Sequence, residues 1–233
     1  MYKKIYFDIL PSTNTYLKEN YHKYPEFTVI ICNNQTKGRG RLNRDWEMEV
    51  GKSIAFSILL KPSQEIARLS LLTSAAVFLA LQKYTNNLQI KWPNDILLNG
   101  KKVSGILLES IYNNKFEAVI VGIGVNVNND IFSENIINKA TSLKNELNRE
   151  FSLDSIIDDI LNNFMVLYKQ YENNVHHYLD ICRNNSSIIG KNVYLNGKKV
   201  KVLGILDNGN LYVDDGESKE EIAYGEVTLE NNY

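Results

Sequence analysis

Short apolar runs separated by polar turns make up the first part of the chain, and this pattern predicts a β-sheet with a few helices. Strand-like runs span residues 2–10, 27–32, 53–60, 88–92 and 96–98. Two further runs, over 102–109 and 116–127, follow the turn sequences Asn99-Gly100 and Asn113-Asn114. Because tight turns of this kind join antiparallel neighbours, the sheet is expected to be antiparallel or mixed rather than doubly wound and parallel.

Apolar residues at helical spacing predict helices over 67–84 and 152–172, and a further helical segment ending near Arg183. Ser12 is expected to cap a short helix over 13–21. From Ile188 onward the chain consists of short apolar runs and turns, which predicts a small β-barrel-like module. The expected fold class is therefore α+β, with one domain over residues 1–185 and a second over 186–233.

The composition is that of an ordinary globular protein, with 44% hydrophobic residues, 23% charged residues and a net charge of −1. A chain without a general positive charge is not expected to have nucleic acid as its main partner.

The N-terminus lacks the apolar region of a signal peptide and no apolar run is long enough to span a membrane, so we expect a cytoplasmic protein without a membrane partner. The two cysteines, Cys32 and Cys182, lie far apart and are expected to be reduced thiols.

Residues 35–46, QTKGRGRLNRDW, are the strongest candidate for a functional segment. Arginine suits phosphate and carboxylate groups because its planar guanidinium binds two oxygens at once. The glycines of this segment allow the backbone to approach a ligand, and Trp46 could stack on a purine. The same residues are also compatible with a solvated basic loop or with an Arg-Gly segment that binds RNA.

A second candidate is residues 91–95, KWPND, followed by a strand that begins near Lys102. The side-chain oxygens of Asn94 and Asp95 suit Mg²⁺ and nucleotide phosphate. Lys102 could neutralise an oxyanion that develops during acyl or adenylyl transfer. The alternative for this segment is an ordinary turn induced by proline.

A third candidate is residues 122–128, GIGVNVN. It begins like the dinucleotide-binding pattern GxGxxG, but Val127 stands where the third glycine is needed and no helix is predicted to follow. Glycines inside a strand indicate instead a place where a ligand lies against the backbone.

These segments in this order, preceded by Ser12-Thr13-Asn14, resemble the biotin–protein ligase family. The family pattern is STN, QxxGRGRxxRxW, KWPND, KxxGIL and GIGxNxN, and all five parts are present. Residues 225–229, GEVTL, are similar to the end of the family's small C-terminal barrel. The resemblance covers nearly the whole chain and implies a catalytic domain like that of class II aminoacyl-tRNA synthetases, with a mixed sheet flanked by helices, followed by an SH3-like barrel.

The resemblance also implies a reaction that uses ATP, biotin and Mg²⁺. The carboxylate of biotin attacks the α-phosphate of ATP, which gives biotinyl-5′-AMP and pyrophosphate. A lysine of a biotin carboxyl carrier protein, usually the subunit of acetyl-CoA carboxylase, then attacks this mixed anhydride and releases AMP. No covalent enzyme intermediate is expected. Pyruvate carboxylase is a further candidate for the protein that accepts biotin. A homodimer is possible, because family members occur as monomers and as dimers.

Site residues are carried over from the family motif by motif. The resemblance implies that biotin is bound by Ser12, Thr13, Asn14, Gln35, Arg39, Gly40, Arg41, Lys102, Gly105, Gly122 and Gly124. It implies that ATP and the adenylate are bound by Arg41, Arg44, Trp46, Asn94, Asp95 and Asn126. Lys102 and Arg39 are the expected catalytic residues, and Asp95 is the expected ligand of Mg²⁺ together with the phosphates.

Two features depart from parts of the family. Some members carry an N-terminal helix-turn-helix module, but only eleven residues precede Ser12, so no DNA partner is expected. Residues 51–53, GKS, lack the Asn-Leu that some members have there. The contact with the nucleotide that the resemblance implies at this position therefore stays open.

Two other functions remain as alternatives. A lipoate–protein ligase shares the adenylation chemistry, but its usual arginine pair, Gly-rich run and His-Asp segment are missing here. A non-enzymatic RNA-binding protein would use the Arg-Gly loop, and the near-zero net charge argues against it.

Overall fold

The computed structural model describes residues 2–62 and 68–229, without the side chain of Asn43. The first strands and helices in chain order are β1 (Lys3–Leu10), α1 (Thr13–Asn20), β2 (Thr28–Gln35), β3 (Ser53–Leu60), α2 (Leu69–Leu81), β4 (Leu88–Lys91), β5 (Asp95–Leu98), β6 (Lys101–Asn113) and β7 (Lys115–Asn126). They are followed by α3 (Leu143–Leu147), α4 (Leu153–Glu172), α5 (His177–Asn184), β8 (Asn192–Leu195), β9 (Lys198–Ile205), β10 (Leu211–Asp214), β11 (Lys219–Ile222) and β12 (Val227–Leu229). Single 3₁₀ turns occur at Tyr21–Lys23 and Arg41–Asn43.

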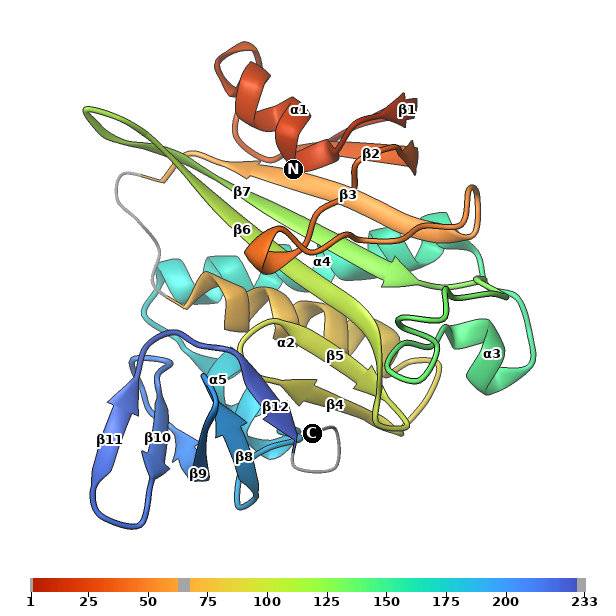
Figure 1. Cartoon of the computed structure of the whole chain (residues 1–233). Helices are drawn as coiled ribbons and strands as arrows, with labels where there is room; N and C mark the ends of the chain where they lie inside the picture. Colours follow the sequence, from red (N-terminus) through yellow and green to blue (C-terminus); the bar gives the residue numbers. More distant parts are fainter. Residues whose placement is uncertain (1, 63–67, 230–233) are drawn as a thin grey trace.

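The main sheet has seven strands in the order β1-β2-β3-β7-β6-β5-β4. Strands β1 and β2 are parallel, whereas the other neighbouring strands are antiparallel. The prediction of a mixed sheet built from tight hairpins is therefore confirmed. In Figure 1 the β6–β7 hairpin runs across the middle of the molecule, with β4 and β5 at one end of the sheet and β1 at the other.

Helices cover both faces of this sheet (Figure 1). Helix α1 packs on β2, β3 and β7, while α2 and α4 lie on the other side, where α2 contacts β4 to β6 and α4 contacts β3. Every residue of β3 is buried, because Leu59 packs with Leu17 of α1 and its neighbours Ile58 and Leu60 belong to the larger core on the opposite face. This explains why the sequence of β3 is a continuous apolar run rather than an alternating one.

Most predicted elements are confirmed with small changes at their ends. The strand over 53–60 coincides with β3, and Ser12 caps α1 by accepting a hydrogen bond from the Thr15 amide at 3.5 Å. Helix α2 is shorter than the predicted 67–84, and residue 67 lies outside the described residues. The short helix α3 was not predicted, because only Leu143 in it is buried and no apolar periodicity marks it.

The C-terminal strands form an antiparallel sheet in the order β11-β10-β9-β8-β12. It packs against α5, where the Arg183 guanidinium donates to the Ile205 carbonyl at 2.8 Å. Trp92, in the turn between β4 and β5, donates its indole N–H to the Gly209 carbonyl at 3.0 Å. The predicted strands of this module are thus confirmed as an antiparallel sheet, and a closed SH3-like barrel stays a prediction, as does the division of the chain after residue 185.

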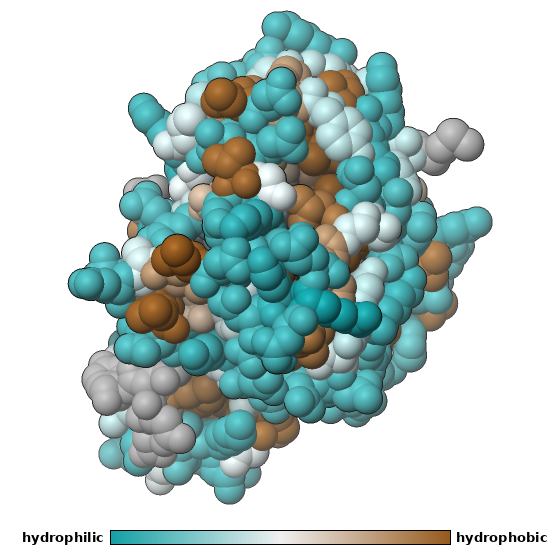
Figure 2. Space-filling model, turned by 90° about the vertical axis from the view of Figure 1, so that its right-hand side faces the viewer, coloured by the Kyte–Doolittle hydropathy of each residue, from teal (hydrophilic) through white to brown (hydrophobic). Residues whose placement is uncertain are grey.

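Hydrophilic side chains dominate the face shown in Figure 2, and hydrophobic side chains appear there in separate small groups. Within the described part of the chain, no helix is both long and apolar enough to cross a membrane.

Candidate active site

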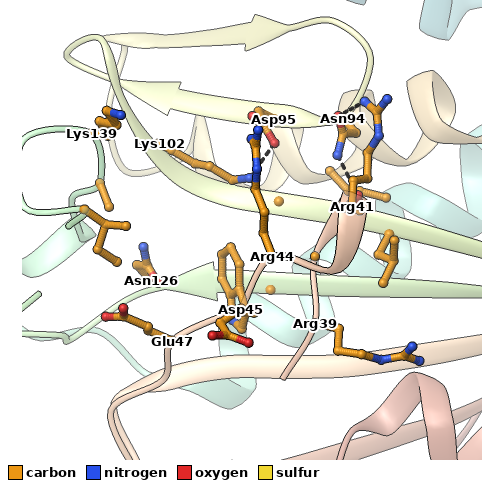
Figure 3. Close-up of a pocket in the computed structure, with 18 of the residues that line it drawn as sticks. Arg39, Arg41, Arg44, Asp45, Glu47, Asn94, Asp95, Lys102, Asn126 and Lys139 are labelled. Atoms are coloured by element: carbon orange, nitrogen blue, oxygen red, sulfur yellow. Dashed lines mark hydrogen bonds and ion pairs between the residues drawn. The ribbon is translucent and has the colours of Figure 1, made fainter. Parts of the chain in front are cut away.

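A cavity of about 810 Å³ lies where the loop after β2 crosses β6 and β7. Its wall also includes the start of α1, the turn before β5, the loop after β7 and the strand β12 (Figure 3). The structure brings all of the predicted site residues to this one cavity: Ser12, Thr13, Asn14, Gln35, Arg39, Gly40, Arg41, Arg44, Trp46, Asn94, Asp95, Lys102, Gly105, Gly122, Gly124 and Asn126.

One end of the cavity carries a cluster of cationic side chains (Figure 3). Lys102 Nζ lies 2.6 Å from Asp95 Oδ1 and 5.7 Å from the centre of the Trp46 ring. Arg41 Nη1 donates to Asn94 Oδ1 at 3.0 Å, and Arg44 Nη1 makes an ion pair with Glu226 Oε1 at 2.5 Å. Oxygen-rich anions such as phosphates are the ligands that such a cluster attracts.

Strand pairing between β5 and β6 places this cluster. Asp95 is the Cα partner of Gly105 at the start of the β5–β6 ladder. The Asn94 side-chain amide donates to the Ile106 carbonyl at 2.8 Å, and the backbone carbonyl of Asn94 accepts from the Ile106 amide at 2.9 Å. The KWPND segment is therefore held rigidly against β6, which fixes the distance between Asp95 and Lys102.

The C-terminal module reaches the same end of the cavity. Arg41 Nη2 donates to the Gly225 carbonyl at 2.9 Å, next to the Arg44–Glu226 ion pair. Two arginines of the loop after β2 are thus bound to the segment that precedes β12. The similarity of residues 225–229 to the end of a small barrel did not predict this contact.

Glycines in β6 and β7 leave room for side chains of the protein itself. A Cβ at Gly124 would lie 2.4 Å from Trp46 Cε2, and one at Gly105 would lie 2.8 Å from Lys102 Cε. A Cβ at Gly122 would lie 2.3 Å from Asn14 Oδ1. The strand glycines thus allow Trp46 and Asn14 to lie against the sheet and form part of the cavity floor. The sequence had predicted only that a ligand would lie close to the backbone at these glycines.

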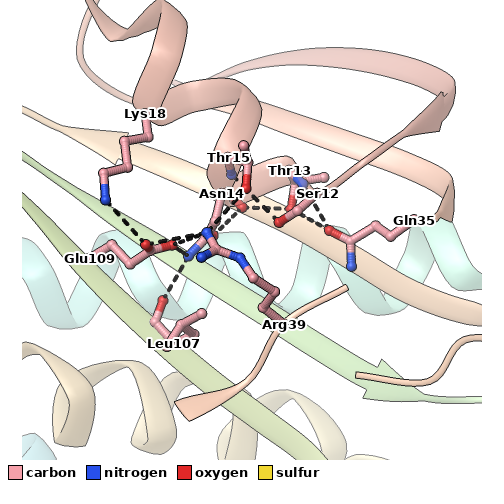
Figure 4. A network of polar contacts seen from close by, with 10 residues as sticks. Ser12, Thr13, Asn14, Thr15, Lys18, Gln35, Arg39, Leu107 and Glu109 are labelled. Atoms are coloured by element: carbon pink, nitrogen blue, oxygen red, sulfur yellow. Dashed lines mark hydrogen bonds and ion pairs between the residues drawn. The ribbon is translucent and has the colours of Figure 1, made fainter. Parts of the chain in front are cut away.

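The opposite end of the cavity is lined by the uncharged polar side chains of Ser12, Thr13, Asn14 and Gln35, with the Arg39 guanidinium beside them (Figure 4). Gln35 Oε1 accepts from the Thr13 amide at 2.8 Å and lies 3.1 Å from the Thr13 hydroxyl. The Ser57 hydroxyl lies 2.6 Å from both Thr13 Oγ1 and Asn14 Oδ1. Such a pocket suits a compact polar group with both donors and acceptors, because each buried polar atom needs a partner.

Arg39 belongs to this polar end and points away from Lys102 (Figures 3 and 4). Its Nη2 donates to Thr15 Oγ1 at 3.0 Å and contacts Glu109 Oε2 at 3.3 Å. The two residues expected to be catalytic are therefore at different ends of the cavity, and the catalytic role of Arg39 stays a prediction.

Several lining residues were not predicted from the sequence. Lys91 lines the cavity at the end of β4, and desolvation by burial lowers the pKa of its ammonium group. The loop after β7 contributes Phe132, Asn135, Ile136, Asn138 and Lys139. Lys91 stands inside the KWPND motif and could have been found there, whereas the loop has neither helical nor strand periodicity to mark it.

The loop after β7 is held over the cavity by its backbone. The Lys102 amide donates to the Lys139 carbonyl at 2.8 Å, and the Thr141 amide donates to the Lys102 carbonyl at 3.0 Å. Asn126 Nδ2 donates to the Thr141 carbonyl at 3.1 Å. Asn126, predicted as a nucleotide ligand, thus also positions this loop.

A metal ion would depend on few protein ligands here. Within the described ranges, no three or more His, Cys, Asp or Glu side chains are grouped so that they could hold a metal. Asp95 is the carboxylate nearest to Lys102 and offers oxygen, the donor that Mg²⁺ prefers.

Residues 6–126 match the model of the biotin/lipoate A/B protein ligase family. The chain belongs to this family. The matched range contains all of the predicted site residues, from Ser12 to Asn126. The resemblance stated from the motifs is therefore confirmed.

Ligases from several bacteria are similar to this chain, some over nearly all of its length and others over part of it. The bifunctional ligase/repressor BirA of Bacillus subtilis is 34% identical over 97% of this chain and 73% of its own length. A biotin–[acetyl-CoA-carboxylase] ligase of Paracoccus denitrificans is 43% identical over 42% of this chain and 43% of its own length. The structure of a biotin protein ligase from Aquifex aeolicus in complex with biotin and ATP has a TM-score of 0.88, 28% identity and 98% coverage of both chains.

Proposed function

We propose that this protein is an ATP-dependent biotin–protein ligase, which converts biotin to biotinyl-5′-AMP and transfers the biotinyl group to a lysine of a biotin carboxyl carrier protein. The observation that carries the proposal is one cavity with a cationic cluster at one end and, at the other, a pocket of uncharged polar side chains with Arg39 beside it. The Aquifex aeolicus protein with the same fold was solved with biotin and ATP. The acetyl-CoA carboxylase subunit is the acceptor we propose, in line with the name of the Paracoccus denitrificans relative.

In the first step, the polar pocket binds the ureido ring of biotin and orients its carboxylate toward the cationic end. Ser12, Thr13, Asn14 and Gln35 supply hydrogen-bonding groups, and a ureido group has both N–H donors and a carbonyl acceptor. Bringing the carboxylate and the α-phosphate together in fixed positions makes the attack effectively unimolecular.

Negative charge develops on oxygen as the biotin carboxylate attacks the α-phosphate and pyrophosphate leaves. Lys102 stabilises this charge, and Arg41 and Arg44 bind the phosphates at the same end of the cavity. Mg²⁺, held by Asp95 and the phosphates, would supply further charge neutralisation when bound. Trp46, whose indole N–H is buried without a partner among the described residues, is placed at the floor to stack on the adenylate.

In the second step, a lysine amine of the carrier attacks the carbonyl carbon of the mixed anhydride, and AMP leaves. Neither step needs a nucleophile of the enzyme. The two cysteines are poorly suited to that role, because both are buried and desolvation raises the pKa of Cys182 to about 12. We therefore propose a reaction without a covalent enzyme intermediate.

The C-terminal module, residues 186–233, is proposed to be an SH3-like domain that supports the loop after β2. The contacts of Arg41 with Gly225 and of Arg44 with Glu226 support this role. A cytoplasmic location and a homodimer remain predictions.

Pyrophosphate release from ATP and Mg²⁺, measured with biotin, lipoate or no acid and without a carrier, tests the proposed function. We expect a burst of about one equivalent per active site with biotin alone, because the adenylate stays bound until an amine arrives. A burst with lipoate alone would make the protein a lipoate ligase instead. No release with either acid, together with a salt-dependent shift of RNA, would favour the RNA-binding alternative.

Replacing Arg39 with alanine is expected to speed the release of biotinyl-5′-AMP about tenfold, because a loop contact that closes the polar end of the cavity is lost. The half-life of the enzyme-bound adenylate, measured by filtration of labelled complex, checks this. Lys37→Ala, in the same loop but outside the cavity wall, is the matched control and should retain the adenylate like the wild type. Equal retention in Arg39→Ala and wild type would contradict the prediction.

A further inference from the structure

Glu109 lies behind the polar end of the cavity, where two side chains of α1 and one of the loop after β2 meet its carboxylate (Figure 4). It stands in β6 and its side chain is 16% exposed. It is not part of the cavity wall, so its effect on a bound ligand has to pass through the residues that it contacts. These are Asn14, Lys18 and Arg39.

The first of these contacts anchors the loop after β2. Arg39 Nη2 lies 3.4 and 3.3 Å from the two carboxylate oxygens of Glu109, and 3.0 Å from Thr15 Oγ1. An ion pair with a half-buried carboxylate is stronger than one in open solvent, because water screens it less. Through these contacts Glu109 links the loop after β2 to α1 and β6, and it holds Arg39 at the polar end of the cavity.

The second contact determines how the Asn14 carboxamide is oriented. Asn14 Nδ2 donates to Glu109 Oε2 at 3.0 Å and to the Leu107 carbonyl at 3.3 Å, so both amide hydrogens have an acceptor. An ionised carboxylate only accepts hydrogen bonds, so it attracts the nitrogen and leaves the oxygen toward Ser57. Asn14, which is 4% exposed and lines the cavity, is thereby left able to accept one more hydrogen bond and unable to donate one.

We propose that Glu109 is a positioning residue for biotin, which anchors the cavity loop through Arg39 and presents Asn14 as a hydrogen-bond acceptor to a ureido N–H. This inference rests on the proposed function. Glu109 itself touches neither substrate nor reacting atoms, and its carboxylate acts at the end of the cavity away from the phosphates. Its loss should therefore weaken the binding of biotin and leave the chemical step and the binding of ATP almost unchanged.

The test compares Glu109→Gln with Lys18→Gln and the wild type in pyrophosphate release at varied biotin and varied ATP. Glutamine keeps the size of the side chain but removes the charge, and its amide group also offers a donor where Asn14 and Arg39 both need an acceptor. We expect the KM for biotin to rise about tenfold, with kcat and the KM for ATP within about twofold, because charge-assisted hydrogen bonds are lost at one end only. Lys18→Gln removes an exposed partner, 3.6 Å from the same carboxylate, and should leave all three constants unchanged.

Limited trypsin cleavage without substrates tests the anchor separately. We expect faster cleavage after Arg39 and Arg41 in Glu109→Gln than in the wild type, with unchanged thermal stability. In the variant Arg39→Gln combined with Glu109→Gln, which lacks the trypsin site at position 39, the rate of cleavage after Arg41 should be no higher than in the more affected single variant, because both changes break one contact.

A biotin KM and a cleavage rate like those of the wild type in Glu109→Gln would overturn the inference. An equal rise of the KM for ATP, or a loss of thermal stability without a split between KM and kcat, would show a merely structural role and would also overturn it. If the wild type itself releases no pyrophosphate with biotin, the proposed function fails, and the part of the inference that concerns biotin fails with it. The trypsin comparison would then still decide whether Glu109 anchors the loop.

Discussion

Replacing Lys102 with alanine is expected to lower the rate of biotin-dependent pyrophosphate release by about 10²–10³-fold, because a fixed cation beside the developing charge is lost. Lys102 lines the cavity at the end that holds Asp95, Arg41 and Arg44. Its stem lies against Gly105 and the Trp46 ring, so its ammonium group is held in place before the reaction begins. Preorganised charge of this kind costs no rearrangement during the chemical step, which is why a large effect is expected.

The matched control for this variant is Lys101→Ala, which removes an exposed lysine from the adjacent position of β6. Successive side chains of a strand point to opposite faces, so this variant should retain the activity of the wild type. Thermal unfolding of both variants should differ little from the wild type, because Lys102 is partly exposed and its ion pair with Asp95 is accessible to water. Normal pyrophosphate release by Lys102→Ala would refute the assigned role.

Replacing Gly124 with alanine is expected to lower kcat/KM for ATP by about tenfold to a hundredfold, because the new methyl group would displace Trp46. A Cβ at this position would lie 2.4 Å from Trp46 Cε2, which is far inside van der Waals contact. The indole ring would have to leave the floor of the cavity, and Lys102, which lies over the same ring, would lose its support. Steady-state kinetics at varied ATP, together with the fluorescence of tryptophan, would measure both consequences.

Gly204→Ala is the control for a glycine-to-alanine change in a strand. Gly204 lies in β9, its φ is not positive, and a Cβ there would meet nothing within 4 Å. This variant should keep its activity and should not lose stability, because alanine restricts the unfolded chain more than glycine does. A Gly124→Ala protein that is as active as the Gly204→Ala protein would show that the position of Trp46 is not needed.

Much of the fold was predictable because it depends on contacts between neighbours in the sequence. The Asn99-Gly100 and Asn113-Asn114 turns predicted two hairpins that the structure contains, and Ser12 predicted the start of α1. Helix α4 was predicted to within one residue, because its apolar residues recur at helical spacing over its whole length. Helix α3 and the loop after β7 were not predicted, because backbone contacts with Lys102 and side chains from distant segments order them.

The residues of the site were identified through family motifs, and their roles stay predictions. Local chemistry alone left alternatives open: a solvated or RNA-binding loop for residues 35–46, and an ordinary turn for residues 91–95. The motifs gained meaning as an ordered set, and the structure then brought all of them to one cavity. Glu109 was overlooked as a candidate, since an isolated acidic residue in a strand carries no local signal of function, and Lys91 was given no role although it stands inside the KWPND motif.

By itself, the sequence determined the fold class, the family and the motif residues that line the cavity, because apolar periodicity, turn residues and ordered motifs are local properties of the chain. Only the tertiary structure decided which residues share an end of that cavity. Arg39 and Lys102 were both expected to be catalytic, and strand pairing and the crossing of the loop over β6 and β7 place them at opposite ends. The physical reason is that such contacts join residues distant in sequence, and their partners depend on the register of the strands between them.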